Sequence, residues 1–304
     1  MVTLRVGNAP CSWGVMGGYD AALYPPYAEV LDRIAATGYA GTELGDWGYL
    51  PTEAARLRDE LGTRGLAMIG ALVPIALAGR ATHPPGRETA LRTARLLAAV
   101  AGPDAPSPFV ILADANGADP VRVQNAGRIR PEHGLSDDQW QAFADGANAI
   151  AAAVRDEAGL RTAFHHHCAG YVETPEETAR LMEMTDPSLL GLCLDTGHWA
   201  LGGGDPLEAL KRYGKRVWHM HFKEYHADVH DRMRTEGLDY FEGLTSHVFY
   251  LLGTGDVEFP SLIAALRASG YDGWVLVEDE LPPGMGCPDE SAAADREYLR
   301  GIGL

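Results

Sequence analysis

Several features that mark common protein classes are scarce or missing in this 304-residue sequence. It has only four cysteines, widely spaced and without a CxxC pair, so we expect no disulfide framework and a cytoplasmic location. Positive charge is also scarce, because 25 lysines and arginines face 42 aspartates and glutamates and leave a formal net charge of -17. This balance argues against nucleic-acid and anionic-membrane partners, which require a basic surface.

Long apolar runs are absent as well. No stretch reaches the length of a membrane span, and the first residues, Met1 to Gly7, contain no apolar core of a signal peptide, so we expect no membrane partner. A glycine-rich dinucleotide fingerprint does not follow the first apolar run, which disfavours a doubly wound open sheet. Hydrophobic residues nevertheless make up 46% of the chain, enough for a sizeable core.

The chain alternates short apolar runs with amphipathic stretches, a pattern typical of parallel βα units. Strands are predicted at 4–9, 40–44, 67–73, 109–114, 161–167, 190–196, 217–223 and 273–279. Helices are predicted near 25–37, 52–64, 86–101, 136–158, 174–184, 205–213, 259–269 and 289–300. Eight such units predict an α/β fold of the (β/α)8 TIM-barrel type, as a single domain over 1–304. The long segment 224–258, an insertion after the seventh strand, is rich in aromatic residues and is expected to form an ordered cover.

Four consecutive predicted strands end in side chains that can bind a metal ion, and in a closed barrel those ends meet. Alternation along a strand turns His165 and His167 to one face and His166 to the helix layer. One nitrogen or oxygen ligand from each strand gives the set His165, Asp195, His221 and Glu278. These ligands suit a divalent ion; Mn2+ or Co2+ is favoured for holding two oxygens of a polyol, and Zn2+ remains an alternative.

Several motifs resemble those of the xylose-isomerase-like barrel superfamily, and within it the inosose (2-keto-myo-inositol) dehydratases. The resemblance covers about 40–280 and is best from 160 onward. It rests on Gly41-Thr-Glu-Leu-Gly45, Ser136-Asp-Asp-Gln-Trp140, Phe164-His-His-His167, Arg180 to Pro187, Asp195-Thr-Gly-His198, His219-Met-His-Phe-Lys223, Gly253 to Phe259 and Glu278-Asp-Glu280.

The resemblance implies roles for individual residues. Asp195, His221 and Glu278 match the superfamily's metal ligands, whereas His165 stands where epimerases and isomerases carry a glutamate. His167 stands where the related dehydroshikimate dehydratases have a histidine proposed as the base. Which of His165 and His167 is the ligand on the fifth strand stays open at this stage.

The implied reaction is dehydration of a cyclic keto-polyol, such as an inosose, through α-proton abstraction and a metal-stabilised enediolate. His167 would take the proton, and Lys223 would help to stabilise the enediolate. For the other candidate residues we expect contact with the sugar or cyclitol, with structural roles as the alternatives; these are His198, Glu43, Glu280 and Trp13.

Three other functions remain open. A metal-dependent sugar isomerase or ketose epimerase is the main alternative, although His165 removes one of the two carboxylates that a two-base epimerase uses. A trinuclear-zinc endonuclease of the same barrel type is disfavoured, because the negative charge would repel DNA phosphates. A sugar-binding barrel without metal is the third, and a homo-oligomer is compatible with all of these readings.

Overall fold

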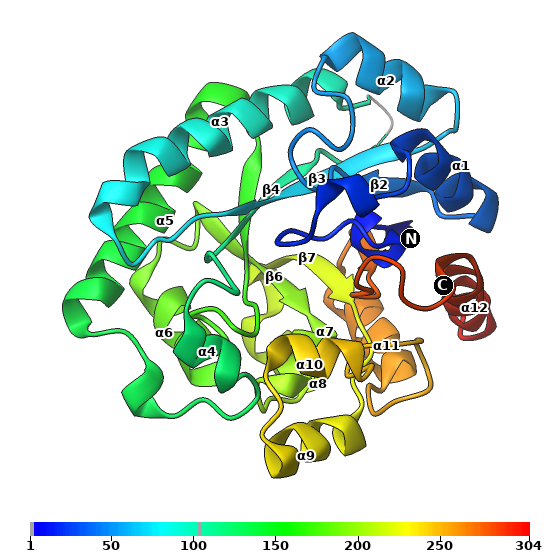
Figure 1. Ribbon diagram of the computed structural model, residues 1–304. Coiled ribbons are helices and arrows are strands. Elements are labelled where there is room, and N and C mark those ends of the chain that lie inside the picture. The colour runs from blue at the N-terminus through cyan, green and yellow to red at the C-terminus, as the bar shows by residue number, and fades with distance from the viewer. Residues whose placement is uncertain (1–2, 103–104) are drawn as a thin grey trace.

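The computed structural model describes residues 3–102 and 105–304, and its central feature is a closed barrel of eight parallel strands (Figure 1). Each strand pairs with the next along the chain, and the last pairs with the first. The strands are β1 Leu4–Asn8, β2 Gly41–Glu43, β3 Ala67–Pro74, β4 Phe109–Ala113, β5 Arg161–His165, β6 Leu190–Asp195, β7 Val217–Phe222 and β8 Gly273–Val277. The predicted TIM barrel is confirmed.

The prediction placed the end of the fifth strand two residues too late. β5 stops at His165, because the backbone N–H of His167 turns back and donates to the carbonyl oxygen of Val172 at 3.0 Å. His167 therefore lies on the loop after the strand. His167 thus leaves the strand, although its ring stays near that of His165, with centroids 5.4 Å apart.

Helices surround the barrel, as Figure 1 shows. All eight predicted helices are present, with α4, α7, α9 and α10 in addition. Their bounds are α1 Tyr27–Thr37, α2 Ala54–Gly62, α3 His83–Val100, α4 Pro120–Gln124, α5 Asp137–Ala158, α6 Pro175–Met184, α7 Thr196–Leu201, α8 Pro206–Tyr213, α9 Ala227–Glu236, α10 Tyr240–Thr245, α11 Phe259–Ser269 and α12 Pro288–Gly301. Among the helices of the described ranges, none combines the length and apolar character that crossing a membrane requires.

Local sequence signals account for the starts of α5 and α6. Ser136 accepts from the backbone N–H of Gln139, and the Gln139 side chain accepts from the N–H of Ser136. Thr174 and Glu177 form the same reciprocal pair at α6, with Pro175 at the first helical position. Both capping boxes satisfy backbone N–H groups that a helix start leaves without partners.

The barrel interior changes from apolar to polar toward the carboxyl ends of the strands. Ile69, Trp274 and Leu276 pack together inside, and Phe109 stacks on His219 with ring centroids 5.6 Å apart. In the register of β6 and β7, Cys193 pairs with His219 and Asp195 with His221. The ionisable side chains of the upper layer therefore rest on a packed apolar floor.

The segment 224–258 contains α9 and α10, which contact each other (Figure 1). Glu224, at its start, is fully buried and accepts from the backbone N–H groups of Tyr225, Gly253 and Val257 at 2.7–3.0 Å. One carboxylate thus joins both ends of the segment. Buried Tyr240 and Phe249 of this segment belong to one apolar cluster.

Asp279, after β8, and Asp295, in α12, form a buried pair of neighbouring acidic side chains. Burial and the nearby Asp279 charge raise the pKa of Asp295 to about 9, and burial raises the pKa of Asp279 to about 6. Asp295 therefore keeps a proton at neutral pH. Its Oδ1 also accepts from the backbone N–H of Leu252 at 2.8 Å, which ties α12 to the segment 224–258.

We expect Asp295→Asn to raise the melting temperature at pH 8.5 and to have a smaller effect at pH 5. An unfolded aspartate loses its proton near pH 3.9, whereas folded Asp295 keeps it up to about pH 9, so the wild-type stability falls as pH rises between those values. Asparagine can donate to Asp279 and accept from Leu252 without this cost. Each kcal/mol gained corresponds to roughly 2–4 °C, measurable by thermal denaturation.

Glu297→Gln is the matched control, because Glu297 is exposed on the same helix. It should leave the pH profile unchanged. A melting-temperature gain for Asp295→Asn that is equal at both pH values, or a loss at pH 8.5, would contradict the raised pKa of Asp295.

Candidate active site

The four side chains predicted as metal ligands meet at the carboxyl end of the barrel. His165, Asp195, His221 and Glu278 are all buried, and each offers a ligand atom within 4.8 Å of the others. They come from four successive strand ends, β5 to β8, as a closed barrel requires. His167 belongs to a neighbouring group with His198 and Glu280. Of the two histidines, His165, the last residue of β5, is therefore the better candidate for a metal ligand.

The hydrogen bonds around the two histidines direct one nitrogen of each into this group. His165 donates from Nδ1 to the carbonyl oxygen of His166 at 2.5 Å, which leaves Nε2 facing Asp195 Oδ2 at 3.9 Å. His221 donates from Nε2 to Glu43 Oε1 at 3.1 Å, and its Nδ1 lies 3.4 Å from Glu278 Oε2. Burial and the neighbouring His221 hold the pKa of His165 well below its usual range, so this imidazole is neutral.

Two buried atoms of the group lack a hydrogen bond within the described residues, namely Asp195 Oδ2 and His221 Nδ1. Asp195 Oδ2 has only longer ion-pair contacts among the described residues, with Lys223 Nζ at 3.3 Å, His221 Nδ1 at 3.7 Å and His165 Nε2 at 3.9 Å. Buried polar atoms left in this way are costly to a protein. Two imidazole nitrogens and two carboxylates that converge on one point fit a divalent cation, which would satisfy both atoms.

Glu43, at the end of β2, supports His221 from behind. Its Oε1 accepts from His219 Nε2 at 3.0 Å and from His221 Nε2 at 3.1 Å. Burial by itself would raise the pKa of Glu43, but the two histidines lower it, so the side chain is a carboxylate. A carboxylate that receives the second N–H of a metal-binding histidine fixes its tautomer and orientation. This contact gives Glu43 a positioning role, and the contact with substrate hydroxyls suggested by the sequence stays a prediction, since Glu43 also lies in the wall of the cavity described below.

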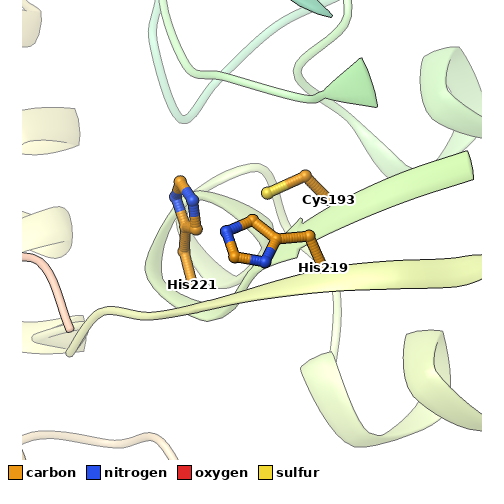
Figure 2. Close-up of side chains that lie close together, drawn as sticks. All are labelled: Cys193, His219 and His221. Carbon is orange, nitrogen blue, oxygen red and sulfur yellow. The ribbon is translucent and has the colours of Figure 1, made fainter. Parts of the chain in front are cut away.

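A third group lies one layer deeper in the barrel, where the sulfur of Cys193 faces the rings of His219 and His221 (Figure 2). His221 is common to this group and the upper one. Burial raises the pKa of Cys193 to about 11. The upper group adds two carboxylates to its two histidines, and oxygen ligands suit Mn2+, so it is the better candidate for such a cation.

Glu280 connects the second group of side chains. Its Oε1 lies 2.7 Å from Lys223 Nζ, 2.9 Å from His198 Nε2 and 3.4 Å from His167 Nε2, and its Oε2 accepts from the Tyr240 hydroxyl at 2.6 Å. Burial would raise the pKa of Glu280, yet Lys223 and His198 hold it well below its usual range. Glu280 is accordingly an ionised acceptor of several hydrogen bonds.

Lys223 carries a positive charge into the same region although its side chain is fully buried. Its Nζ lies 3.0 Å from Glu278 Oε2 and 3.3 Å from Asp195 Oδ2, in addition to Glu280. Burial would lower the pKa of Lys223, but these three carboxylates raise it well above its usual range. The lysine thus connects the two groups by charge.

A cavity of about 580 Å³ opens above both groups. The predicted site residues in its wall are Glu43, His165, His167, His221, Glu278 and Glu280. Lys223 and His198 are not in the wall, because they lie behind Glu280, so the structure does not support the direct contacts with the polyol suggested for them. Trp13 is also outside the wall: its ring is buried and its Nε1 donates to Asn8 Oδ1 at 2.7 Å, which points to packing and not to stacking on a sugar.

His166 faces the helix layer, as strand alternation predicted. Its ring meets Trp199 of α7 edge-on, with centroids 5.0 Å apart, and its Nε2 accepts from the backbone N–H of Asp195 at 3.1 Å. Burial lowers the pKa of His166 to about 3, which keeps the ring neutral and able to accept. The middle histidine thus holds Asp195 in place.

Tyr240 is one of the cavity residues that the sequence did not single out. It lies on α10, within the segment 224–258, and its only signal was the aromatic content of that segment. Its hydroxyl donates to Glu280, and its ring lies 5.8 Å from that of His167. Burial and the Glu280 charge raise the pKa of Tyr240 well above its usual range, so the phenol stays protonated.

Comparison with known proteins agrees with this geometry. The pattern of the family described as Xylose isomerase-like TIM barrel matches residues 31–302. The chain belongs to this family. It is 32% identical over 300 residues to an inosose dehydratase of Geobacillus kaustophilus, which covers 97% of this chain and 93% of that protein. An inosose dehydratase of Lacticaseibacillus casei is 30% identical over 301 residues, covering 98% of this chain and 96% of that protein.

Solved structures share the fold at lower identity. The probable 3-DHS dehydratase AsbF of Bacillus anthracis matches with a TM-score of 0.70 at 15% identity, covering 98% of this chain and 99% of that one. A D-allulose 3-epimerase from Methylomonas sp. matches with a TM-score of 0.69 at 17% identity, covering 99% of each chain. At these identities the likeness shows the barrel fold alone. The two structures are a probable dehydratase and an epimerase, so the fold does not distinguish between these reactions.

We expect Tyr240→Phe to loosen α10, because its hydroxyl provides a hydrogen bond to a charged group at the cavity wall. Losing such a bond should speed amide hydrogen exchange across 240–245 by about tenfold. Tyr250→Phe is the matched control, since Tyr250 lies in the same segment and its hydroxyl makes no hydrogen bond within the described part of the chain. Equal exchange in the two variants would show that the Tyr240–Glu280 contact does not hold α10.

Proposed function

We propose that this protein is a metal-dependent hydro-lyase that dehydrates a cyclic keto-polyol such as an inosose. The observation that carries the proposal is the placement of His167 beside the four candidate metal ligands. One of these ligands is His165, which stands where a two-base epimerase carries a catalytic carboxylate. The full-length similarity to inosose dehydratases supports the same reaction class. The polyol would occupy the polar floor of the cavity.

His165, Asp195, His221 and Glu278 would hold the divalent ion, with Mn2+ or Co2+ favoured over Zn2+. Such an ion supplies Lewis-acid polarisation of the ketone and stabilises the negative charge that develops on its oxygen. The residues around the group prepare it, since Glu43 orients His221, and the His166 ring accepts from the Asp195 backbone.

His167 is oriented as a base. Its Nδ1 donates to the carbonyl oxygen of Cys168 at 2.6 Å, so Nε2 carries the free lone pair at the cavity wall. His167 takes the proton from the carbon next to the ketone and can pass it to the hydroxyl that departs from the next carbon. The C–H and C–O bonds break, a carbon–carbon double bond forms, and water leaves without a change in oxidation state.

Glu280 assists this proton transfer. The carboxylate lies 3.4 Å from His167 Nε2, so it stabilises the imidazolium that forms when the proton is taken. Lys223 and His198 hold Glu280 from behind, and Tyr240 holds its other oxygen. Lys223 and His198 are thus positioning residues, since they act through Glu280.

Incubation with an inosose and Mn2+ should produce the absorbance of a conjugated dione and a product lighter by one water. His167→Gln should lower kcat about 100-fold or more, because a positioned base contributes roughly 10²–10⁴-fold. His133→Gln, a change far from the cavity, is the control and should keep wild-type turnover. Absence of water loss would overturn the dehydratase proposal, and a product of unchanged mass would favour the isomerase or epimerase alternative.

Glu43→Gln should weaken Mn2+ binding by about 10–100-fold, because it removes the carboxylate that orients His221. The dissociation constant can be measured by calorimetry on chelator-treated protein, with the rise in melting temperature on adding Mn2+ as a second readout. Glu88→Gln, on the exposed face of α3, is the matched control. If Mn2+ neither binds wild-type protein saturably nor stabilises it, the metal proposal is wrong and the sugar-binding barrel becomes the better reading.

A further inference from the structure

Exposed apolar side chains gather around the mouth of the active-site cavity. Within residues 3–102 and 105–304, five large apolar side chains are between 37% and 63% exposed: Leu23, Trp47, Leu72, Val121 and Phe241. Three of them, Trp47, Leu72 and Phe241, line the cavity that also contains His167 and Glu280. Single exposed apolar residues are ordinary, whereas a group of them beside a polar site marks a binding surface.

The three side chains reach the mouth from separate parts of the chain. Trp47 follows β2, Leu72 lies in β3, and Phe241 lies on α10. The guanidinium carbon of Arg92 lies 4.1 Å from the centre of the Trp47 ring, so the indole is held by a cation–π contact although it is exposed. The apolar rim is therefore a built feature of the cavity and includes two aromatic rings.

The size of the cavity exceeds what the proposed reaction needs. Its volume of about 580 Å³ falls within the range of roughly 300–1,000 Å³ that encloses drug-sized ligands, whereas a cyclic keto-polyol is a single six-membered ring. Besides the candidate site residues, the wall contains several apolar side chains, namely Val15, Met16, Leu72, Trp47, Phe241 and Leu244, with Asp46 next to Trp47. Hydroxyl groups alone would leave this apolar part of the wall without a matching partner.

We propose that the natural substrate is a keto-polyol bearing an aromatic or similarly flat apolar substituent. The polyol end occupies the polar floor, a placement that rests on the proposed function, and the substituent lies against Trp47, Leu72 and Phe241. Offset or edge-on contact with the two aromatic side chains would add to the burial of apolar surface. The rim thus selects among substrates that share the same reacting ring.

The test compares two probes that carry the same ring, phenyl and methyl 3-keto-β-D-glucopyranoside. Their dissociation constants are measured by calorimetry on Mn2+-loaded His167→Gln protein, so that binding is read without depending on turnover. Burying a phenyl group should make the phenyl probe bind about tenfold tighter or more. Trp47→Ala and Phe241→Ala, each in the same background, should each reduce this affinity ratio by about threefold or more.

Leu23→Ala is the matched control, because Leu23 is exposed but lies outside the cavity, and it should preserve the ratio. Equal binding of the two probes, or a ratio unchanged in both Trp47→Ala and Phe241→Ala, would overturn the proposal. If the protein is a dimer that Trp47→Ala dissociates, and the two probes bind with equal affinity, the rim is a contact surface for a second copy of the chain and not a substrate site. Failure of the dehydration assay leaves the binding ratio intact, so the two proposals fail separately.

Discussion

The buried ammonium of Lys223 is the charge on which the arrangement of the site depends. It lies within 3.3 Å of carboxylates from Asp195, Glu278 and Glu280, three acidic side chains that would otherwise repel one another in a buried space. Like charges this close cannot all remain ionised without compensation. Lys223 therefore allows a dense acidic cluster to persist at the end of a packed barrel, and its removal would leave the carboxylates without their common partner.

The two groups of side chains that Lys223 connects differ in their chemistry. On one side, His165, Asp195, His221 and Glu278 converge, and Asp195 Oδ2 and His221 Nδ1 have no hydrogen bond within residues 3–102 and 105–304, which suits a cation. On the other, Glu280 is saturated by donors and faces His167, which suits proton transfer. The two parts lie side by side because consecutive strands supply them, and a substrate in the cavity would touch both.

Supporting contacts come from buried polar residues next to the site. Glu43 orients His221, the His166 ring orients Asp195, and Glu224 closes the segment that brings Tyr240 to Glu280. The cavity is thus built from rigid strand ends below and from α10 above, and the cover adds a phenol and apolar rim residues to the wall.

Much of this protein was readable from the sequence, because it depends on periodicity and local chemistry. The βα alternation predicted the barrel, the capping boxes predicted helix starts, and period-two alternation turned His166 away from its neighbours. Convergence of His165, Asp195, His221 and Glu278 followed from strand order alone. The family match over residues 31–302 agrees with these predictions.

Other features were decided only by the tertiary structure, since they depend on distances between residues far apart in the chain. Strand periodicity could not show that β5 ends at His165, which moved His167 into a separate group, or that Lys223 and His198 lie behind Glu280. The burial of Trp13 and the contact of Tyr240 with Glu280 have no local pattern either. The sequence by itself determined which chemical groups meet at the barrel end, and three-dimensional packing decided which of them face the cavity.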